Sequence, residues 1–347
     1  MEWNEFMTQS EIEEVEKMIR DKESIISQIK PRNEEIRLPS YENYEDLLRS
    51  DYLNKLSDDE RRRLVPNSVR KFNDARYEGD LLNDKRHGLG KMIYDNGRVY
   101  FGEWRNDVRQ GRGVEHYSNG NKYTGDFANG KAHGIGVYTW NNGEVYQGEW
   151  VSGVKHGKGK WTSPNGDCYI GDWSDSKAHG WGKHTWSNGD AYEGEWNACI
   201  KHGRGIETYV ETGDKYVGEF LDGKPHGYGK YTYRNNTIYQ GMFQDGKKHG
   251  KGKIVTAQGH IYIGDFRNDV KEGKGYFVWP SKNEYRGEFK GDKRNGKGKM
   301  KWNDGSCYAG DWVEGIQHGY GNMTFTDGRK PKIGRFNQNH FEEESIA

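Results

Sequence analysis

A short pattern, Tyr-x-Gly-(Asp/Glu)-(Trp/Phe), returns every 23 residues through most of the chain, with one spacing of 24 between Tyr192 and Tyr216. Its tyrosines are Tyr77, Tyr100, Tyr123, Tyr146, Tyr169, Tyr192, Tyr216, Tyr239, Tyr262, Tyr285 and Tyr308. A second pattern, His-Gly-x-Gly, follows about ten residues after each tyrosine. A fixed period of this size is produced by stacked copies of one supersecondary unit, so the chain is restricted to a repeat architecture.

Each unit is predicted to be a β-hairpin. In the segment 100–104, strand alternation places Tyr100, Gly102 and Trp104 on one face and Glu103 on the other. The segment 134–140 alternates in the same way. Asn-Gly and Asp-Gly pairs such as Asn119-Gly120 join successive units and favour tight hairpin turns. The expected fold is therefore a mainly β, antiparallel meander.

The composition indicates how such a sheet is held together. Apolar residues make up only 32% of the chain, whereas it contains 49 Gly, 12 Trp and 23 Tyr. Because a single-layer sheet has no second sheet to cover its apolar face, we expect aromatic rings to lie over glycine backbone, where no Cβ intrudes. On the opposite face we expect cross-strand ion pairs. Their acids would be Glu103, Asp172, Glu195, Asp265 and Glu288, and their lysines Lys91, Lys160, Lys183, Lys230, Lys253 and Lys299.

The unit that runs from Tyr146-Gln147-Gly148-Glu149-Trp150 through His156-Gly157-Lys158-Gly159 to Asn165-Gly166 resembles a MORN (membrane occupation and recognition nexus) repeat. The resemblance covers about residues 77–336. It implies a single-layer twisted sheet of about 11 tandem hairpins. It also implies a non-enzymatic scaffold or adaptor, similar to radial spoke head components of motile cilia, basal-body scaffolds and cortical scaffolds. Family members that are lipid kinases or methyltransferases carry a separate catalytic domain, and junctophilins supply the alternative of a membrane-apposed tether or phosphoinositide-responsive module.

The segment 1–72 differs from the repeats, since it contains no Gly. A capping box at Ser10 and Glu13 predicts a helix of about 20 residues that ends before Pro31. Its apolar stripe is Ile12, Val15, Ile19, Ile26 and Ile29, and it either covers the first edge strand of the sheet or docks a partner. A second short helix is expected around 41–56 and a third from Ser57 to Leu64. The predicted organisation is a helical segment (1–72), a repeat array (73–336) and a C-terminal tail (337–347).

Several classes of function are disfavoured by charge and spacing. The 53 basic and 53 acidic residues balance, so the phosphate-neutralising excess of nucleic-acid binders is missing. Histidines at equivalent positions of successive units should lie about 9.5 Å apart, too far to share a zinc ion with bonds of about 2.0–2.1 Å. They are expected to stabilise turns instead. Three sparse cysteines predict no disulfide framework, and no nucleotide or nucleophile motif is present, so neither a cofactor nor an enzyme is expected.

Two surfaces are predicted to carry function. The first is a partner-binding aromatic face, since exposed aromatic grooves mark protein contacts. Its residues are Tyr100, Trp104, Tyr123, Trp140, Tyr146, Trp150, Trp161, Tyr169, Trp173, Trp186, Tyr192 and Trp196. The second, belonging to the alternative function, is a lipid-headgroup surface of Lys247, Lys248, Lys290 and Lys293.

The expected partners are axonemal or cytoskeletal proteins, and the expected location is the cytoplasmic cytoskeleton, in a cilium, axoneme or basal body. A homodimer through the terminal edge strands or the first helix is a further expectation, because open sheet edges must be covered.

Overall fold

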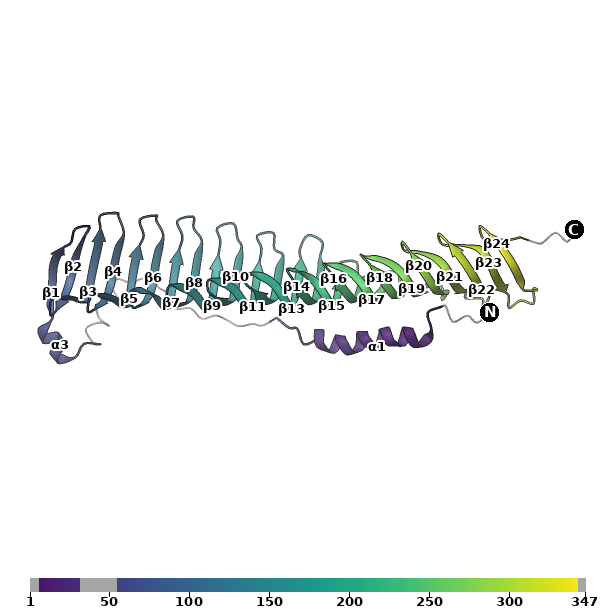
Figure 1. Cartoon of the computed structure of the whole chain (residues 1–347), viewed down its shortest axis with the longest axis horizontal. Coiled ribbons are helices and arrows are strands. Elements are labelled where there is room, and N and C mark those ends of the chain that lie inside the picture. Colours follow the sequence, from purple (N-terminus) through teal and green to yellow (C-terminus); the bar gives the residue numbers. More distant parts are fainter. Residues whose placement is uncertain (1–5, 32–54, 343–347) are drawn as a thin grey trace. The chain divides into compact units, whose positions relative to one another are not determined.

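The computed structural model describes residues 6–31 and 55–342 of the chain. These residues form two helices and 25 strands, and they divide into two compact units (Figure 1). We call residues 32–200 the leading unit, and residues 1–31 together with 201–347 the trailing unit.

The leading unit contains helix α3 (Asp58–Arg63) and twelve strands paired antiparallel in chain order. The strands are β1 (Val65–Lys71), β2 (Ala75–Leu82), β3 (Lys85–Tyr94), β4 (Val99–Arg105), β5 (Val108–His116), β6 (Lys122–Ala128), β7 (Lys131–Thr139), β8 (Val145–Val151), β9 (Val154–Thr162), β10 (Cys168–Ser174), β11 (Lys177–Thr185) and β12 (Ala191–Asn197).

The trailing unit contains helix α1 (Gln9–Ile26) and thirteen strands with the same meander order. The strands are β13 (Ile200–Tyr209), β14 (Asp214–Leu221), β15 (Lys224–Thr232), β16 (Ile238–Gln244), β17 (Lys247–Val255), β18 (Ile261–Arg267), β19 (Val270–Val278), β20 (Glu284–Lys290), β21 (Lys293–Lys301), β22 (Cys307–Val313), β23 (Ile316–Thr324), β24 (Lys332–Asn337) and β25 (His340–Phe341). The antiparallel hairpin meander predicted from the repeat is confirmed in both units.

Tyrosine rings over paired glycines form the interior of each sheet. Gly148 of β8 lies opposite Gly136 of β7 and Gly159 of β9. The ring of Tyr146 covers Gly148 and Gly159 and is completely buried. A Cβ at Gly148 would stand 2.6 Å from both the Gly159 Cα and the Tyr146 Oη, so only glycine fits beneath the ring.

Two repeated hydrogen bonds fix the rings. The Tyr146 hydroxyl donates to the Glu149 carbonyl at 3.1 Å. Each of the eleven motif tyrosines makes this bond to the residue three positions later. The Trp150 indole donates to the Gly136 carbonyl at 3.2 Å, and its ring meets that of Tyr146 edge-on at 5.3 Å. The surface that carries these rings is called the ring face below, and the opposite surface is called the helix face.

The Asp or Glu carboxylate of the Tyr-x-Gly-(Asp/Glu)-(Trp/Phe) motif accepts a backbone hydrogen bond, a role that was not predicted. Oε1 of Glu149 accepts the backbone N–H of Lys158 at 2.9 Å, and Oδ2 of Asp172 accepts that of Trp181 at 2.9 Å. These bonds hold the tight bend at the first glycine of His-Gly-x-Gly, where Gly157 has φ +57°.

The predicted ion-pair register was wrong. Since the strand-one glycine pairs directly with the second glycine of the preceding unit, the acid after it faces the residue between the two glycines. Asp172 therefore pairs with Lys158 at 2.7 Å rather than with Lys160, and Asp265 pairs with Lys251 at 2.8 Å rather than with Lys253.

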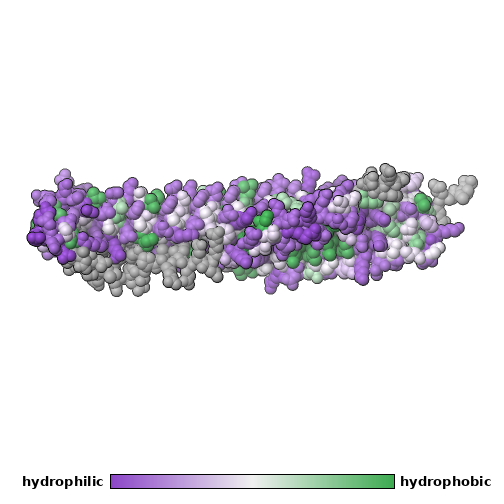
Figure 2. Space-filling view, turned by 90° about the horizontal axis from the view of Figure 1, so that it is seen from below, coloured by the Kyte–Doolittle hydropathy of each residue, from purple (hydrophilic) through white to green (hydrophobic). Residues whose placement is uncertain are grey.

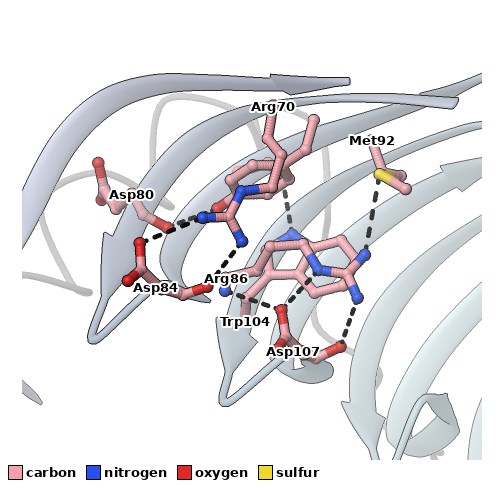
Figure 3. Close-up of polar contacts among 9 residues, drawn as sticks. Arg70, Asp80, Asp84, Arg86, Met92, Trp104 and Asp107 are labelled. Atoms are coloured by element: carbon pink, nitrogen blue, oxygen red, sulfur yellow. Dashed lines mark hydrogen bonds and ion pairs between the residues drawn. The ribbon is translucent and has the colours of Figure 1, made fainter. Parts of the chain in front are cut away.

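Neighbouring turns are tied together by the residue before the histidine position. Figure 3 shows this at the start of the leading unit, where Arg86 reaches Asp107 of the next turn at 3.0 Å. The same guanidinium lies 4.4 Å above the Trp104 ring. Arg70 of β1 makes a similar contact, donating to the Asp84 carbonyl at 2.7 Å. Cations thus cover rings and connect successive hairpins at the same time.

Helix α1 lies on the helix face of the trailing unit, against β15, β17 and β18 (Figure 1). Its cap is Thr8 with Glu11, two residues before the predicted capping box. Ile12, Val15, Ile19 and Ile26 are buried, with Ile29 packed beside them, in a cluster that includes Tyr228 and Ile263. The apolar stripe of α1 therefore packs on interior strands of the trailing unit, at Tyr228 and Ile263, rather than on an edge strand of that unit.

The rest of the N-terminal segment is only partly helical. Helix α3 begins at the predicted Ser57 and Glu60 capping box. Residues 65–71 form strand β1 within the segment that was predicted to be helical, and β25 falls within the predicted tail. The helix predicted around 41–56 lies almost wholly outside the described residues.

Gly148→Val should destabilise its hairpin by about 1–3 kcal/mol, because the new side chain must displace either the Tyr146 ring or the neighbouring strand. Hydrogen exchange of residues 145–162 should accelerate. Val151→Ala, at an exposed position of the same strand, is the matched control and should leave exchange unchanged. Equal protection in both variants would contradict the ring-over-glycine account.

Ile19→Asp should release α1 from the sheet, because it places a charge in the apolar seat beside Tyr228. Amides of residues 9–26 should lose hydrogen-exchange protection while β13–β24 keep theirs. Lys17→Asp, on the exposed side of the helix, should leave α1 protected. Unchanged protection of α1 in Ile19→Asp would contradict the observed seat.

Candidate functional site

Most of the predicted aromatic surface is buried within the leading unit. Nine of its residues are at most 7% exposed, because they pack on glycines and on one another. They are Tyr100, Trp104, Tyr123, Tyr146, Trp150, Tyr169, Trp173, Tyr192 and Trp196. These side chains hold the sheet together and have little area left for a partner.

The remaining three, Trp140, Trp161 and Trp186, are half-buried. Each lies near the end of a second strand, beside the tight link to the next hairpin. Tyr138 packs 4.6 Å from Trp140, and His184 stacks 4.5 Å from Trp186. Together Tyr138, Trp140, Trp161, His184 and Trp186 form what we call the margin row, a line of partly accessible rings on the ring face.

Fixed hydrogen bonds orient the margin row. The Trp161 indole donates to Glu144 at 3.1 Å, and the Asn121 amide donates to the Tyr138 hydroxyl at 2.8 Å. Burial lowers the pKa of the His184 imidazole, which favours its neutral form. The row therefore presents pre-oriented, mainly uncharged ring surfaces, which suits contact with another protein at small entropic cost.

One lysine adds charge to this row. The Nζ of Lys155 lies 5.4 Å from the Trp140 ring centroid, 5.3 Å from that of Tyr146 and 4.4 Å from that of Trp173. Burial among these rings lowers the pKa of its ammonium. Three rings surround the Lys155 ammonium. This lysine therefore contributes more to packing than to the attraction of a charged ligand.

The trailing unit repeats the same arrangement. Tyr209, Tyr231, Tyr233, Phe277 and Trp279 are half-buried at corresponding positions, and Phe277 packs 4.4 Å from Trp279. These rings, together with Tyr138 and His184, were not among the predicted surface residues. The signal was present, because strand alternation from the second glycine places each of them on the ring face.

The four lysines assigned to the lipid alternative differ in how far they are engaged within the protein. Lys247 and Lys290 are exposed. Lys293 is paired with Glu314 at 2.5 Å, and Lys248 lies over the Tyr233 and Tyr239 rings with Asp269 at 4.0 Å. Two of the four charges are thus already engaged within the protein.

Other chemistry-bearing residues are dispersed. Within the described ranges 6–31 and 55–342, no group of three or more His, Cys, Asp or Glu side chains could hold a metal ion. Over those same residues, no helix has the length and apolar character needed to cross a membrane. Cys168, Cys199 and Cys307 are free thiols.

The chain belongs to the MORN repeat family. The model of this repeat matches eleven successive segments, and these account for most of the sequence. The matched residues are 77–97, 100–122, 123–145, 146–168, 169–191, 192–211, 216–238, 239–261, 262–284, 285–307 and 308–328. The resemblance inferred from the repeat is confirmed.

Comparison with other known proteins adds no functional argument. No curated protein sequence matches the chain. Among solved structures, the TCP10 domain of Danio rerio CPAP is 12% identical, covers 57% of this chain and 94% of its own, and has a TM-score of 0.33. The Drosophila melanogaster SAS-4 TCP domain, in complex with a proline-rich motif of Ana2, is 14% identical over 45% of this chain and 84% of its own, with a TM-score of 0.30. Virginiamycin B lyase from Staphylococcus aureus is 9% identical over 78% of this chain and 93% of its own, with a TM-score of 0.15.

The solvent accessibility of the margin-row tryptophans can be measured by iodide quenching of tryptophan fluorescence. Replacing Trp140, Trp161 and Trp186 together by Phe should remove a large part of the iodide-accessible emission, because these indoles are half-exposed. The matched variant with Phe at Trp150, Trp173 and Trp196 should lose emission that iodide does not quench, since those indoles are buried. Equal loss of quenchable emission in the two variants would contradict the proposed accessibility.

Proposed function

We propose that this protein is a non-enzymatic scaffold that binds other proteins through the margin row and through the edges of its repeat sheets. The observation that supports this proposal most directly is the division of the ring face. The central rings of this face are buried by packing on glycine, while one line of pre-oriented rings stays accessible in each unit.

The physical argument concerns what such a surface can do. Accessible Trp and Tyr side chains supply large contact areas with few rotatable bonds, and they dominate the binding energy of many protein interfaces. Margin-row rings stand at every hairpin from Tyr138 to Trp186, so the surface suits an extended partner segment. One hollow in the described residues is lined by both Cys307 and Glu284, but burial raises the pKa of the Cys307 thiol and so disfavours the reactive thiolate.

We place this scaffold in the cytoskeleton, in a ciliary axoneme, a basal body or a cortical array. The support is the MORN repeat family itself, since radial spoke head components and basal-body scaffolds also contain MORN repeats. A membrane-apposed tether is the other function known for MORN repeats, and the internal pairing of Lys248 and Lys293 counts against it here.

Proximity labelling from a tagged chain in ciliated cells tests the proposal. The parent chain should label a defined set of axonemal or basal-body proteins, and the variant with Ala at Trp140, Trp161 and Trp186 should lose most of that set. Partner loss of this kind is expected because truncation of interface tryptophans costs about 2 kcal/mol or more each. The control variant carries Ala at the exposed Val108, Val151 and Val154 and should keep the set.

Two results would contradict the proposal. One is labelling that is identical for the Trp variant and the parent chain. The other is a signal confined to membrane proteins together with co-sedimentation of the purified chain with phosphoinositide vesicles, which would favour the tether.

A further inference from the structure

The surface on which α1 packs, called the seat of α1 here, shows which kind of helix the helix face of the trailing unit can bind. Two side chains form its floor: Tyr228, 2% exposed, whose hydroxyl donates to the Ile19 carbonyl at 3.3 Å, and Ile263, 3% exposed. Three ion pairs flank this floor, and each joins a glutamate of the helix to a lysine of the sheet. They are Glu23–Lys230 at 3.3 Å, Glu16–Lys253 at 2.9 Å and Glu11–Lys274 at 3.5 Å.

The helix crosses successive hairpins in the direction opposite to the chain. Glu23, Glu16 and Glu11 meet lysines of β15, β17 and β19 in turn, and the Gln9 side chain accepts a hydrogen bond from Arg286 of β20 at 3.1 Å. Each step of five to seven helical residues spans about 8–10 Å, which matches the width of one hairpin. Beyond β20 the same face continues without α1. Figure 2 shows this side of the unit, with a hydrophilic band over the outward surface of the helix.

At the end of the array a Tyr and an Ile again stand at the two repeat positions that form the floor, here on adjacent strands rather than three strands apart. Tyr320 occupies the position of Tyr228, between the two glycines of His-Gly-x-Gly, and Ile333 occupies the position of Ile263, before the strand-one glycine. Their exposures are 62% and 71%, against 2% and 3% for the pair beneath α1. They lie on the adjacent strands β23 and β24, where Ile333 pairs with Asn322.

Cations accompany this second floor. Lys299 and Lys301 of β21 and Arg335 of β24 lie on the same face, and none of the three has an ion pair within the described part of the chain. An open hollow of about 600 Å³ leads from the N-terminal end of α1 toward them. Its lining includes Met7, Arg286, Lys299 and Lys301, together with one acid, Glu284, which stands opposite Lys301 in the β20–β21 register. Asp311, the acid nearest to Tyr320, is already bound to Lys297 and to the Tyr320 N–H.

We propose that this surface, which we call the second helix seat (Lys299, Lys301, Tyr320, Ile333 and Arg335), binds an acidic amphipathic helix of a partner protein. The inference rests on the proposed scaffold function and specifies a second contact surface for it. Two observations carry it: the continuity of the surface with the seat of α1, and its unpaired positive charge beside exposed apolar side chains. The occupant needs an apolar stripe with glutamates spaced five to seven residues apart, as in α1.

The occupant is a partner rather than a second copy of this chain. The apolar stripe of α1 is consumed in its own seat, where Ile12, Val15, Ile19 and Ile26 are at most 6% exposed. Occupying the second seat with another copy's α1 would therefore empty an equivalent seat and gain no buried area.

A synthetic, fluorescein-labelled peptide with the sequence of residues 6–29 serves as the probe, because it carries the chemistry required of the occupant. Its binding to the full chain is followed by fluorescence anisotropy at low and physiological salt. Ile333→Asp and Lys301→Glu should each weaken binding by about tenfold, a change of about 1.4 kcal/mol. Both positions are exposed, so neither variant should disturb the sheet. Val69→Asp, at a comparably exposed apolar position of β1, is the matched control and should bind as the parent chain does.

The position at which the peptide binds shows whether it occupies the second helix seat or replaces α1 in its own seat. A photocrosslinker on the peptide should label β21–β24 in the parent chain. Labels on β15–β18 would show exchange with α1 and overturn the inference, as would equal binding of a scrambled peptide or no binding at all. A lipid-binding surface would give a different result: phosphatidylserine vesicles would displace the peptide from the parent chain, and the vesicles would not bind the Ile333→Asp variant. That result would also overturn the inference.

The two proposals fail separately. Recovered protein partners without peptide binding would contradict only the second helix seat. Specific peptide binding by a chain that labels no partner through the margin row would contradict only the scaffold function.

Discussion

The contact between a tyrosine ring and a pair of facing glycines is the interaction on which every hairpin of this protein depends. A sheet with one layer has no other sheet to remove its apolar side from water, so its interior must be built within the layer. Tyr146 and its equivalents achieve this by lying flat over backbone that has no Cβ and by donating to a carbonyl three residues later. The indole of the same motif and that of the next motif then meet the tyrosine ring edge-on, as Trp150 and Trp173 do with Tyr146.

This solution explains the pattern of polar residues around it. The motif acid is not chiefly half of an ion pair, since it accepts the N–H exposed by the glycine bend, as Glu149 does from Lys158. Cations before the histidine position cover the rings and reach the next turn, as Arg86 does with Trp104 and Asp107. Acids and bases of the repeats are thus engaged within the sheet, at their own turn or at the next one.

Partner proteins can bind only to surfaces that the packing of rings on glycines leaves accessible. On the ring face it is the margin row, half-buried because each ring has a neighbour on one side and the tight link on the other. On the helix face of the trailing unit it is the apolar and cationic area that α1 covers at Tyr228 and Ile263 and leaves open at Tyr320 and Ile333. The same repeat positions thus serve as an intramolecular seat in one place and as an accessible surface in another, which is the arrangement expected of a scaffold built from near-identical units.

The hairpin, its alternation, the meander and the place of glycine under tyrosine could all be predicted from the sequence, because they depend on contacts within 23 residues that recur eleven times. It could not determine the partner of the acid, since the pairing of Gly171 with Gly159 rather than with a neighbouring residue sets which lysine faces Asp172. Nor could it locate α1, whose contacts with Tyr228 and Ile263 join residues more than 200 positions apart and depend on which face each strand presents. It also overestimated the aromatic surface, because strand alternation shows which rings share a face but not which of them are covered by the next hairpin. Those choices belong to the tertiary structure, where burial is decided by neighbours that are distant in sequence.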